Sequence, residues 1–501
     1  MSISGVGSSS SQAIQQLVTM RSQFDDLQRQ LSTGQKSTTY AGLGLDRGVT
    51  VSLNSQLSAI SGYEDSITNV GNRISLMNTA LTRMSDLGSA VKSAVAQAKT
   101  TDPASGASAT QQTAQSSLDE LLGLLNTDSG GRYLFSGRAT DKPAVETMDH
   151  ILNGNGSQAG LKQIISERNQ ADLGADGLGR LVISQPSSTS VSVGEDAVSP
   201  FGIKLASVSS TLTNATVTGP TGSPASLSVD MSGGNPNPGD NLTVRFNLPD
   251  GTTSSLTLTA TTDSPPGANQ FTIGATPAAT ATNLQTALTS GIGQLAGGAL
   301  TAASAVTASN EFFSGDANNP PQRVAGPPFT SATAMTAGSA ANTVIWYTGE
   351  AGSDSARATS TARVDQNLVV SYGARANEDG IRTLVQNMAT LAAVNVPANA
   401  SNTASLSSEL DQRVNTNITG QAGDQTVSSI EVDLANSQNA MTAAKTRHQQ
   451  TSGTLNDYLQ QIEGVSNEDV SAQILALQTR MQASMQTTAM LFQTNLINYL
   501  K

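Results

Sequence analysis

The chain has 501 residues, a net charge of −12, and few aromatic (3%) or charged (13%) residues. This length allows roughly three domains of about 150 residues each. Because aromatic side chains normally dominate core energetics, we expect thin cores and long packed elements rather than a compact enzyme. The acidic balance, with no basic run interleaved with aromatics, excludes the usual footprint of a nucleic-acid binder. The absence of cysteine excludes disulfides and thiolate metal sites.

The first residues, Met1 to Gln12, contain neither the basic segment nor the apolar core of a cleaved secretory signal. No apolar stretch approaches the roughly 18 residues that a membrane span needs. We therefore expect no membrane insertion, and an export route, if the protein is exported, that reads no cleaved apolar signal.

Near the N-terminus, apolar residues recur at intervals of three and four, the period of an amphipathic helix. A first run ends at Gly34, a good helix terminator, and a longer run continues to Asp102 and Pro103. If residues 50–99 are all helical, they span about 75 Å. A shorter run over 114–125 predicts one more helix. The two long stripes comprise Ile14, Leu17, Met20, Phe24, Leu27 and Leu31, and then Leu57, Ile60, Tyr63, Ile67, Val70, Ile74, Met77, Leu81, Met84, Leu87, Val91, Val95 and Ala98.

The C-terminal end mirrors this pattern, with a break at Gly464. Neither end has a second apolar face of its own, so each needs a partner helix, and the other end of the chain is the simplest partner. The two C-terminal stripes comprise Val427, Ile430, Leu434, Ser437, Met441, Ala444, His448, Thr451, Leu455, Tyr458 and Ile462, and then Val470, Ile474, Leu477, Met481, Met485, Leu491, Phe492, Leu496 and Tyr499.

The middle of the chain alternates with period two and predicts strands. Residues 226–260 predict several strands, with a β-hairpin turn at Pro249–Asp250–Gly251. We expect strands to continue at Phe271 and Ile273, at 344–347 and at 368–372, and a short helix over 280–292. The expected fold is therefore α+β and multidomain: long N- and C-terminal helices pair as an antiparallel, coiled-coil-like bundle with a β-rich middle insertion.

The expected divisions follow from these patterns. They are an assembly helix with a disordered start (1–40), the N-terminal part of a helical rod (41–150), a mixed or β-rich outer region (151–395), the C-terminal part of the rod (396–464) and a C-terminal assembly helix (465–501).

Several short motifs, in order and at fitting distances from the ends, resemble the bacterial flagellin superfamily. They are Leu31–Lys36 after the first helix, Leu124–Asn126 followed by Gly131–Gly137, Gln482–Gln493, and the tail Leu496–Lys501. The last two resemble the hook–filament junction protein, of hook-associated protein 3 type, more closely than a filament flagellin, and the motif Tyr133–Gly137 also favours the junction type. The sequence departs from many relatives at Tyr40–Asp46, and the middle region carries no motif of the family.

The resemblance implies a structural subunit of the bacterial flagellum that polymerises through its terminal helices, at the hook–filament junction or as a filament flagellin. It implies an extracellular location, export without a cleaved signal peptide, and as partners further copies of the chain, the hook-side junction protein, flagellin and an export chaperone. We expect no enzyme activity and no cofactor or metal. The predicted assembly interface comprises Ile14, Leu17, Phe24, Leu27, Leu31, Ile474, Leu477, Met481, Met485, Phe492, Leu496 and Tyr499.

Other readings stay open at this point. A secreted adhesin or carbohydrate-binding protein would carry recognition in residues 200–330, with Trp346 and Tyr347 as a stacking platform, although such a pair is more often core. His448 lies on a helical stripe, which predicts a helix–helix contact rather than catalysis. His150 has no recognisable catalytic context, and Asp172 and Asp176 lack the ligand spacing of a calcium loop.

Overall fold

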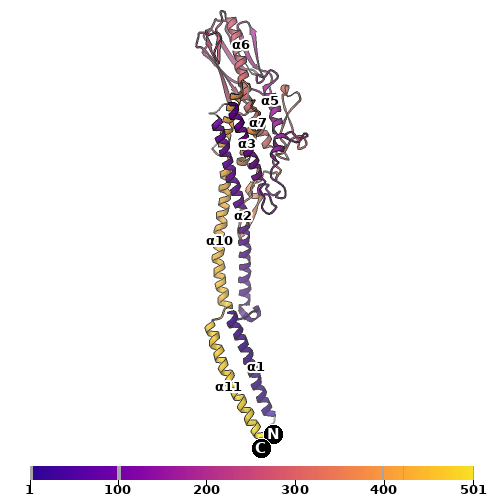
Figure 1. The fold of residues 1–501 in the computed structure, drawn as a ribbon, viewed down its shortest axis with the longest axis vertical. Coiled ribbons are helices and arrows are strands. Elements are labelled where there is room, and N and C mark those ends of the chain that lie inside the picture. Colours follow the sequence, from indigo (N-terminus) through magenta and orange to yellow (C-terminus); the bar gives the residue numbers. More distant parts are fainter. Residues whose placement is uncertain (1–3, 99–102, 398–399, 421, 500–501) are drawn as a thin grey trace. The chain divides into compact units, whose positions relative to one another are not determined.

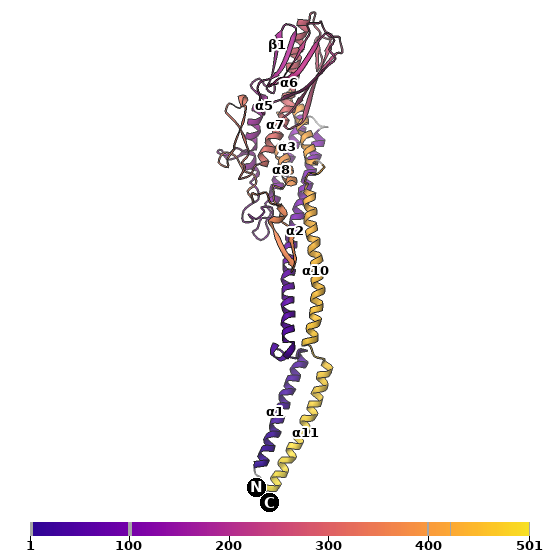
Figure 2. The same ribbon diagram turned by 180° about the vertical axis from the view of Figure 1, so that it is seen from behind.

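The computed structural model describes residues 4–98, 103–397, 400–420 and 422–499, with the side chains of these residues except 4–10, 103–107, 491–492 and 494–499. The chain divides into two compact units. The first contains residues 1–70, 362–370 and 439–501, and the second contains residues 71–361 and 371–438. Figures 1 and 2 show the elements of both units.

The first unit is built from helices that pair lengthwise. In it, α1 (Ser4–Thr33) lies antiparallel beside α11 (Asn467–Tyr499), as Figures 1 and 2 both show. A short 3-10 helix, η1 (Tyr40–Asp46), leads into α2 (Arg47–Ala98), and α10 (Val427–Glu463) returns the chain. The early part of α2 packs on the late part of α10 through a small cluster centred on Leu53, Leu455 and Leu459.

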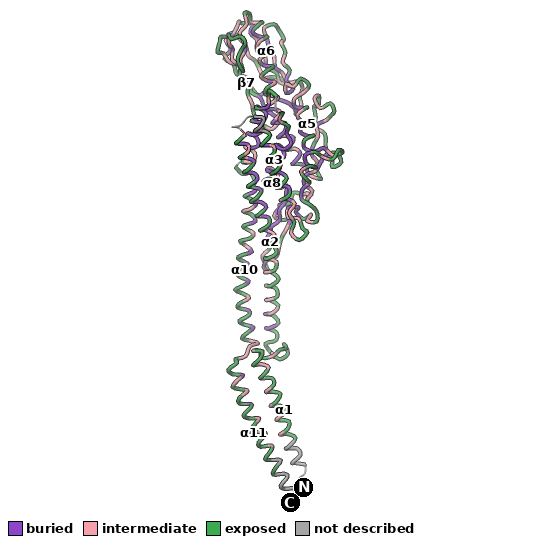
Figure 3. The backbone as a smooth tube through the Cα atoms, viewed as in Figure 1, coloured by how far each residue is buried: buried purple, intermediate pink, exposed green. Residues whose placement is uncertain are grey.

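The second unit holds a helical body with a better-filled core. The stripe of α2 is buried from Ile74 to Val95, and α8 (Asp379–Ala393) is buried along nearly all its length. Small residues such as Ala389 and Ala392 let α8 pack closely on its neighbours, and Figure 3 shows this concentration of buried residues around α3 and α8. The other helices of this body are α3 (Pro103–Leu125), α4 (Met148–Asn153), α5 (Leu161–Leu173), α7 (Thr301–Ser314) and α9 (Thr403–Thr419).

Two four-stranded sheets and one helix, α6 (Pro277–Leu295), share a single apolar core within the second unit. The strand orders are β1-β2-β5-β4 and β3-β6-β7-β8. All neighbouring strands are antiparallel except β7 and β8. The strands are β1 (Leu181–Ser187), β2 (Ser190–Glu195), β3 (Lys204–Ser210), β4 (Thr216–Thr221), β5 (Ser226–Asp230), β6 (Asn241–Asn247), β7 (Thr253–Thr261) and β8 (Gln270–Thr272).

Both the chain itself and a buried ion pair fasten this β region to the helical body. A five-residue π-helical turn, η2 (Ala296–Leu300), joins α6 directly to α7. The carboxylate of Asp250, in the β6–β7 turn, lies 2.7 Å from the guanidinium of Arg413 on α9, and both side chains are buried. A buried pair of this kind fixes geometry because separating it would leave an uncompensated charge.

The remaining elements are short. They are β9 (Arg323–Val324) paired with β10 (Met335–Thr336), β11 (Thr361–Asp365) paired with β12 (Leu368–Ser371), and the 3-10 turns η3 (Phe329–Ser331) and η4 (Ala356–Thr359).

The predicted α+β, multidomain fold is confirmed, with long helices at both ends and a β-rich middle. The predicted hairpin is β6–β7, in which Val244 stands opposite Leu256, and Gly251 takes the positive φ of +80° that the turn requires. The predicted short helix over 280–292 is α6, which begins three residues earlier.

Some local predictions were wrong. Residues 344–347 form no strand; the backbone there bonds to separate loop segments, including Glu146 N to Trp346 O at 2.9 Å. In α10 the predicted Thr451 and Tyr458 are exposed, and Leu459 faces the partner helix instead. The backbone of α1 is helical from Ser4, within the serine-rich start that was expected to be disordered.

Candidate assembly surface

The α1–α11 pair has well-defined ends. Gly34, at φ +69°, terminates α1, and its N–H donates to Gln30 O at 2.8 Å. At the start of α11, the Ser466 hydroxyl accepts a 3.2 Å bond from Asp469 N. Glu468 and Asp469 place negative charge in the first turn, where the helix dipole favours it. Both helices therefore have local signals that fix where they begin or end.

The predicted interface residues differ in how far they are buried in this pair. Leu477 is buried, while five others are half-buried and three are exposed. The side chains of Phe492, Leu496 and Tyr499 lie outside the described residues. The half-buried residues are Leu17, Phe24, Leu27, Ile474 and Met481, and the exposed ones are Ile14, Leu31 and Met485.

A second set of apolar side chains on these helices faces solvent. Val18 and Leu475 are each 64% exposed, and Val18 lies one turn from Ile14, which is 51% exposed. The sequence reading missed Val18 and Leu475 because they fall outside the stripes. The i, i+4 spacing from Ile14 is the signal that could have found Val18. Burial against another surface would stabilise such groups by about 25 cal/mol per Å² of apolar area.

The inner side of the pair is also incompletely filled. A groove of about 460 Å³ lies between α1 and α11, with apolar walls at Leu27 and Leu477 and charges at Asp26 and Arg480. Among the side chains described in α1 and α11, only Val470 and Leu477 are buried. Over the part of the pair whose side chains are described, it thus lacks the close-packed core that normally stabilises a helix dimer in water.

The turn after α1, at Gly34–Lys36, lies against the turn between α10 and α11, at Glu463–Val465. Lys36 N donates to Glu463 O at 2.6 Å, and Val465 N donates to Gly34 O at 3.1 Å. The Lys36 ammonium donates to Ile462 O at 2.7 Å, at the C-terminal end of α10. A cation there interacts favourably with the unpaired carbonyls and the helix dipole. Main-chain and side-chain hydrogen bonds therefore link these two turns.

His448 makes the helix–helix contact that the stripe predicts. It is buried, its ring stacks on Tyr63 with centroids 5.6 Å apart, and Nε2 lies 2.8 Å from Val364 O. Nearby, Arg447 pairs with Asp365; a backbone hydrogen bond from Gln366 and this arginine hold the pKa of Asp365 below its ordinary value. These contacts fasten the β11–β12 turn to the helices of the first unit.

The motif Gly131–Gly137 is structural and belongs to the second unit. Phe135 is fully buried, and its carbonyl accepts a 2.8 Å bond from Ala376 N, just before α8. Beside it, Arg138 bridges Glu350 at 2.5 Å and Asp354 at 3.1 Å, and the hydrogen bond to Asp354 leads the causes that raise the pKa of Arg138. The motif therefore joins the end of α3 to the loop that precedes α8.

Candidate catalytic and ligand residues have structural roles. Trp346 is completely buried, and its Nε1 donates to Phe313 O at 2.9 Å, which confirms the core reading over a stacking platform. Asp172 is buried, pairs with Arg168 at 2.8 Å, and accepts a bond from Gly202 N. His150 lies 2.9 Å from Glu146 on the same turn of chain. Within the described part of the chain, no group of three or more His, Asp or Glu side chains could hold a metal ion.

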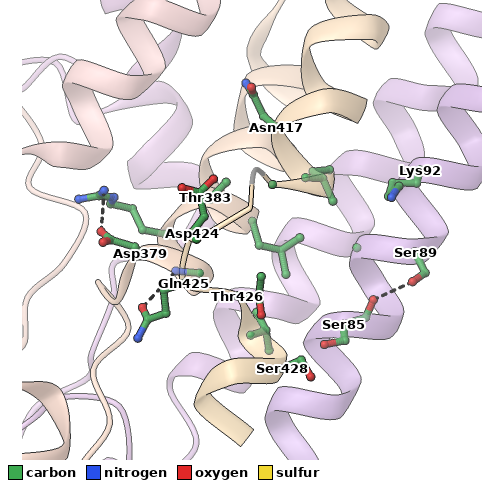
Figure 4. Close-up of a pocket in the computed structure, with 18 of the residues that line it drawn as sticks. Ser85, Ser89, Lys92, Asp379, Thr383, Asn417, Asp424, Gln425, Thr426 and Ser428 are labelled. Atoms are coloured by element: carbon green, nitrogen blue, oxygen red, sulfur yellow. Dashed lines mark hydrogen bonds and ion pairs between the residues drawn. The ribbon is translucent and has the colours of Figure 1, made fainter. Parts of the chain in front are cut away.

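A cavity of about 730 Å³ opens in the second unit between α2, α8 and the loop after α9 (Figure 4). Its charged side chains are largely committed to neighbours: Lys92 donates to Thr419, and Asp379 pairs with Arg382 at 2.8 Å. No histidine is among the described residues lining it, so none of them forms a hydroxyl–imidazole pair.

Residues 7–140 match the family model of the bacterial flagellin N-terminal helical region. The match covers α1, η1, α2, α3 and the segment containing the Gly131–Gly137 motif. No curated protein matches the chain. The match supports the bacterial flagellin family, which is structural and non-enzymatic and forms extracellular flagellar filaments by self-association. No helix in the described ranges is long and apolar enough to cross a membrane.

Proposed function

We propose that this chain is an axial structural subunit of the bacterial flagellum that polymerises through α1 and α11 at the hook–filament junction. The observation that carries the assembly step is the incompletely buried α1–α11 pair, with Ile14, Val18 and Leu475 exposed to solvent. In a polymer, these apolar side chains would be buried between copies of the chain, which supplies the free energy of association.

The junction position has a narrower basis. It rests on the resemblance of two stretches, Gly131–Gly137 and Gln482–Gln493 with the tail that follows, to hook–filament junction proteins of hook-associated protein 3 type. Its partners would be further copies of the chain, the hook-side junction protein on one side and flagellin on the other. We further propose that the chain leaves the cell without a cleaved signal peptide and with the help of an export chaperone.

Removal of residues 482–501 tests the assembly step. The truncated chain should remain monomeric under conditions in which the full chain polymerises, because it lacks the end of α11. The circular dichroism and unfolding transition of the second unit should stay intact, since residues 71–361 and 371–438 contain no part of α11. Normal polymers of the truncated chain would refute assembly through the terminal pair.

Electron microscopy with a specific antibody tests the position. Label confined to the distal end of the hook supports the junction subunit, whereas label along the filament identifies a filament flagellin. A deletion strain gives an independent answer, since loss of a junction subunit should leave hooks without filaments. A strain that keeps normal filaments and motility would contradict both axial positions.

A further inference from the structure

Two Asn–Gly steps follow one another in the second unit, between α4 and α5. Asn153–Gly154 closes α4, and Asn155–Gly156 forms the turn that follows. An asparagine side chain before glycine is open to attack by the glycine's backbone nitrogen, because glycine has no Cβ to crowd the approach. The two steps share this local sequence but differ in geometry.

At Asn155 the side-chain carbonyl is polarised. Its Oδ1 accepts a 2.9 Å hydrogen bond from Gln158 N and a 3.0 Å bond from the Ser157 hydroxyl. Two donors on one carbonyl oxygen stabilise the negative charge that develops when a nucleophile adds to its carbon. The nitrogen of the same amide, Nδ2, donates a third hydrogen bond, to Gln158 Oε1 at 2.5 Å.

The nucleophile at this step is accessible. Gly156 is exposed, with φ at +83°, and a Cβ built on it would meet no atom within 4 Å. Within the described ranges, no hydrogen bond engages its N–H. The amide nitrogen is therefore open to solvent base and beside the polarised carbonyl.

Asn153 has the opposite arrangement. The N–H of Gly154 is committed to His150 O at 2.9 Å as the helix cap, and a Cβ there would lie 2.1 Å from Gln158 O. The Asn153 amide is held away from the backbone, with Nδ2 donating to Asp149 at 2.7 Å and Oδ1 accepting from Lys162 at 3.0 Å. The fold thus protects one step and exposes the other.

We propose that Asn155 is a spontaneous modification site of the folded protein, which water converts to aspartate and isoaspartate. Gly156 N loses its proton to solvent base and bonds to Asn155 Cγ; the Cγ–Nδ2 bond breaks and the amide leaves as ammonia. Water then opens the cyclic imide at one of its two carbonyls. Attack at Cγ breaks the bond from Cγ to Gly156 N and gives aspartate. Attack at the backbone carbonyl carbon of residue 155 breaks the bond from that carbon to Gly156 N and gives isoaspartate, with the backbone routed through Cγ.

The modification would act on a small network. The new carboxylate has no donor in place of Nδ2. Its oxygen and Gln158 Oε1 are both acceptors, so the hydrogen bond between the two side chains is lost. Gln158 in turn holds His150 Nε2 at 3.3 Å and donates to Ala340 O at 2.6 Å. Reaction at Asn155 therefore adds one negative charge and loosens the contact between this turn and residues near Ala340.

Timed incubation of the intact chain in mildly alkaline buffer, with a parallel sample in urea, tests the proposal. Mass spectrometry of the peptide ending at Lys162 distinguishes residues 153 and 155 by fragmentation. The native sample should lose ammonia at Asn155 first, and the urea sample should react at both asparagines at similar rates. Equal rates at the two positions in the native sample, or protection of both, would overturn the proposal.

Ser157→Ala removes one donor to Oδ1 and tests the polarisation. The native rate at Asn155 should fall about two- to tenfold, which matches the loss of one hydrogen bond, and the rate in urea should not change. An isoaspartate assay on the product checks the cyclic route, since direct hydrolysis yields aspartate alone. An unchanged native rate in Ser157→Ala, or a product without isoaspartate, would contradict the mechanism.

Discussion

The ammonium of Lys36 donates a 2.7 Å hydrogen bond to the carbonyl oxygen of Ile462, 426 residues further along the chain. This contact caps the C-terminal turn of α10 with a residue from the turn after α1. Because Lys36 N also bonds to Glu463 O at 2.6 Å, one residue contributes both a main-chain and a side-chain link to the same crossing. The turn after α1 and the C-terminal end of α10 are therefore linked at this crossing.

Lys36→Met should remove the side-chain hydrogen bond to Ile462 O and destabilise the end of α10 without unfolding the first unit. Removing a cation from a helix C-terminus lowers stability by about 0.3–1 kcal/mol at an exposed position. The amide of Gly464, which donates to Gln460 O at 2.8 Å, should exchange with deuterium several-fold faster. Lys445→Met is the matched control, because Lys445 is an exposed lysine on the same helix. Equal acceleration in both variants would show that the capping contact is unimportant.

The long apolar stripes of the helices were predictable because the residues that recur every three or four positions are also the residues that the fold buries. Every predicted position of α2 from Ile67 to Val95 is buried, since a continuous helix forces residues three and four apart onto one face. The same argument placed His448 at a helix contact. In α10 the predicted contact at Tyr458 was wrong. Leu459 is the buried residue, and the weak apolar pattern of this helix does not distinguish two adjacent apolar residues.

The strands β1 to β4 were missed for a different reason. They are short and rich in Ser and Thr, and each carries only one to three large apolar side chains, too few for a period-two alternation to be recognised. The segment 344–347 shows the converse error. Val344, Trp346 and Tyr347 looked like a strand by composition, but they are buried in an irregular segment whose bonding partners lie near Val145 and Ala159. Such pairing depends on tertiary contacts that periodicity does not encode.

Two serines on α7 offer a test of hydrogen-bond satisfaction in the core. Both are fully buried, but the Ser304 hydroxyl donates to Leu300 O at 2.9 Å, whereas that of Ser309 has no partner among the described residues. Ser309→Ala should raise the free energy of unfolding by about 1 kcal/mol, and Ser304→Ala should lower it by about 0.5–1.5 kcal/mol. Chemical denaturation of both variants measures the difference. Equal effects of the two changes would contradict the assignment.

Glu311 and Asp240 should shape the pH dependence of stability with opposite signs. Burial raises the pKa of Glu311 above 4.5, with Arg168 offsetting part of the shift. The folded state then holds this proton more tightly than the unfolded state, so its contribution is full below the unfolded pKa and is lost as pH rises through the folded pKa. Hydrogen bonds from Thr213 hold the pKa of Asp240 below 3.8, so its contribution is present above that value and is lost as pH falls.

Glu311→Gln should therefore gain stability relative to the parent as pH rises from about 4 to 7, because the glutamine stays neutral and can still accept from Arg168. Asp240→Asn should lose stability at neutral pH and approach the parent in acid. Thermal unfolding measures the two slopes, for Glu311→Gln from about pH 4 to 7 and for Asp240→Asn from neutral pH down to values below 3.8. Slopes of the same sign would contradict the opposing environments of the two carboxyl groups.

Val18→Asp and Leu475→Asp test whether the exposed apolar side chains of α1 and α11 drive association. Each residue is 64% exposed in the single chain, so a carboxylate there stays solvated and should change the stability of the monomer by less than about 0.5 kcal/mol. Burial of the same carboxylate between copies would carry a desolvation penalty of several kcal/mol, which should prevent polymers from forming at concentrations that suffice for the parent.

Ser22→Asp adds an equal charge at an exposed polar position of α1 and is the control for net charge. Sedimentation velocity measures association, and circular dichroism verifies helix content. Polymerisation of the Val18 and Leu475 variants at the rate of the Ser22 variant would exclude these two side chains from the subunit interface.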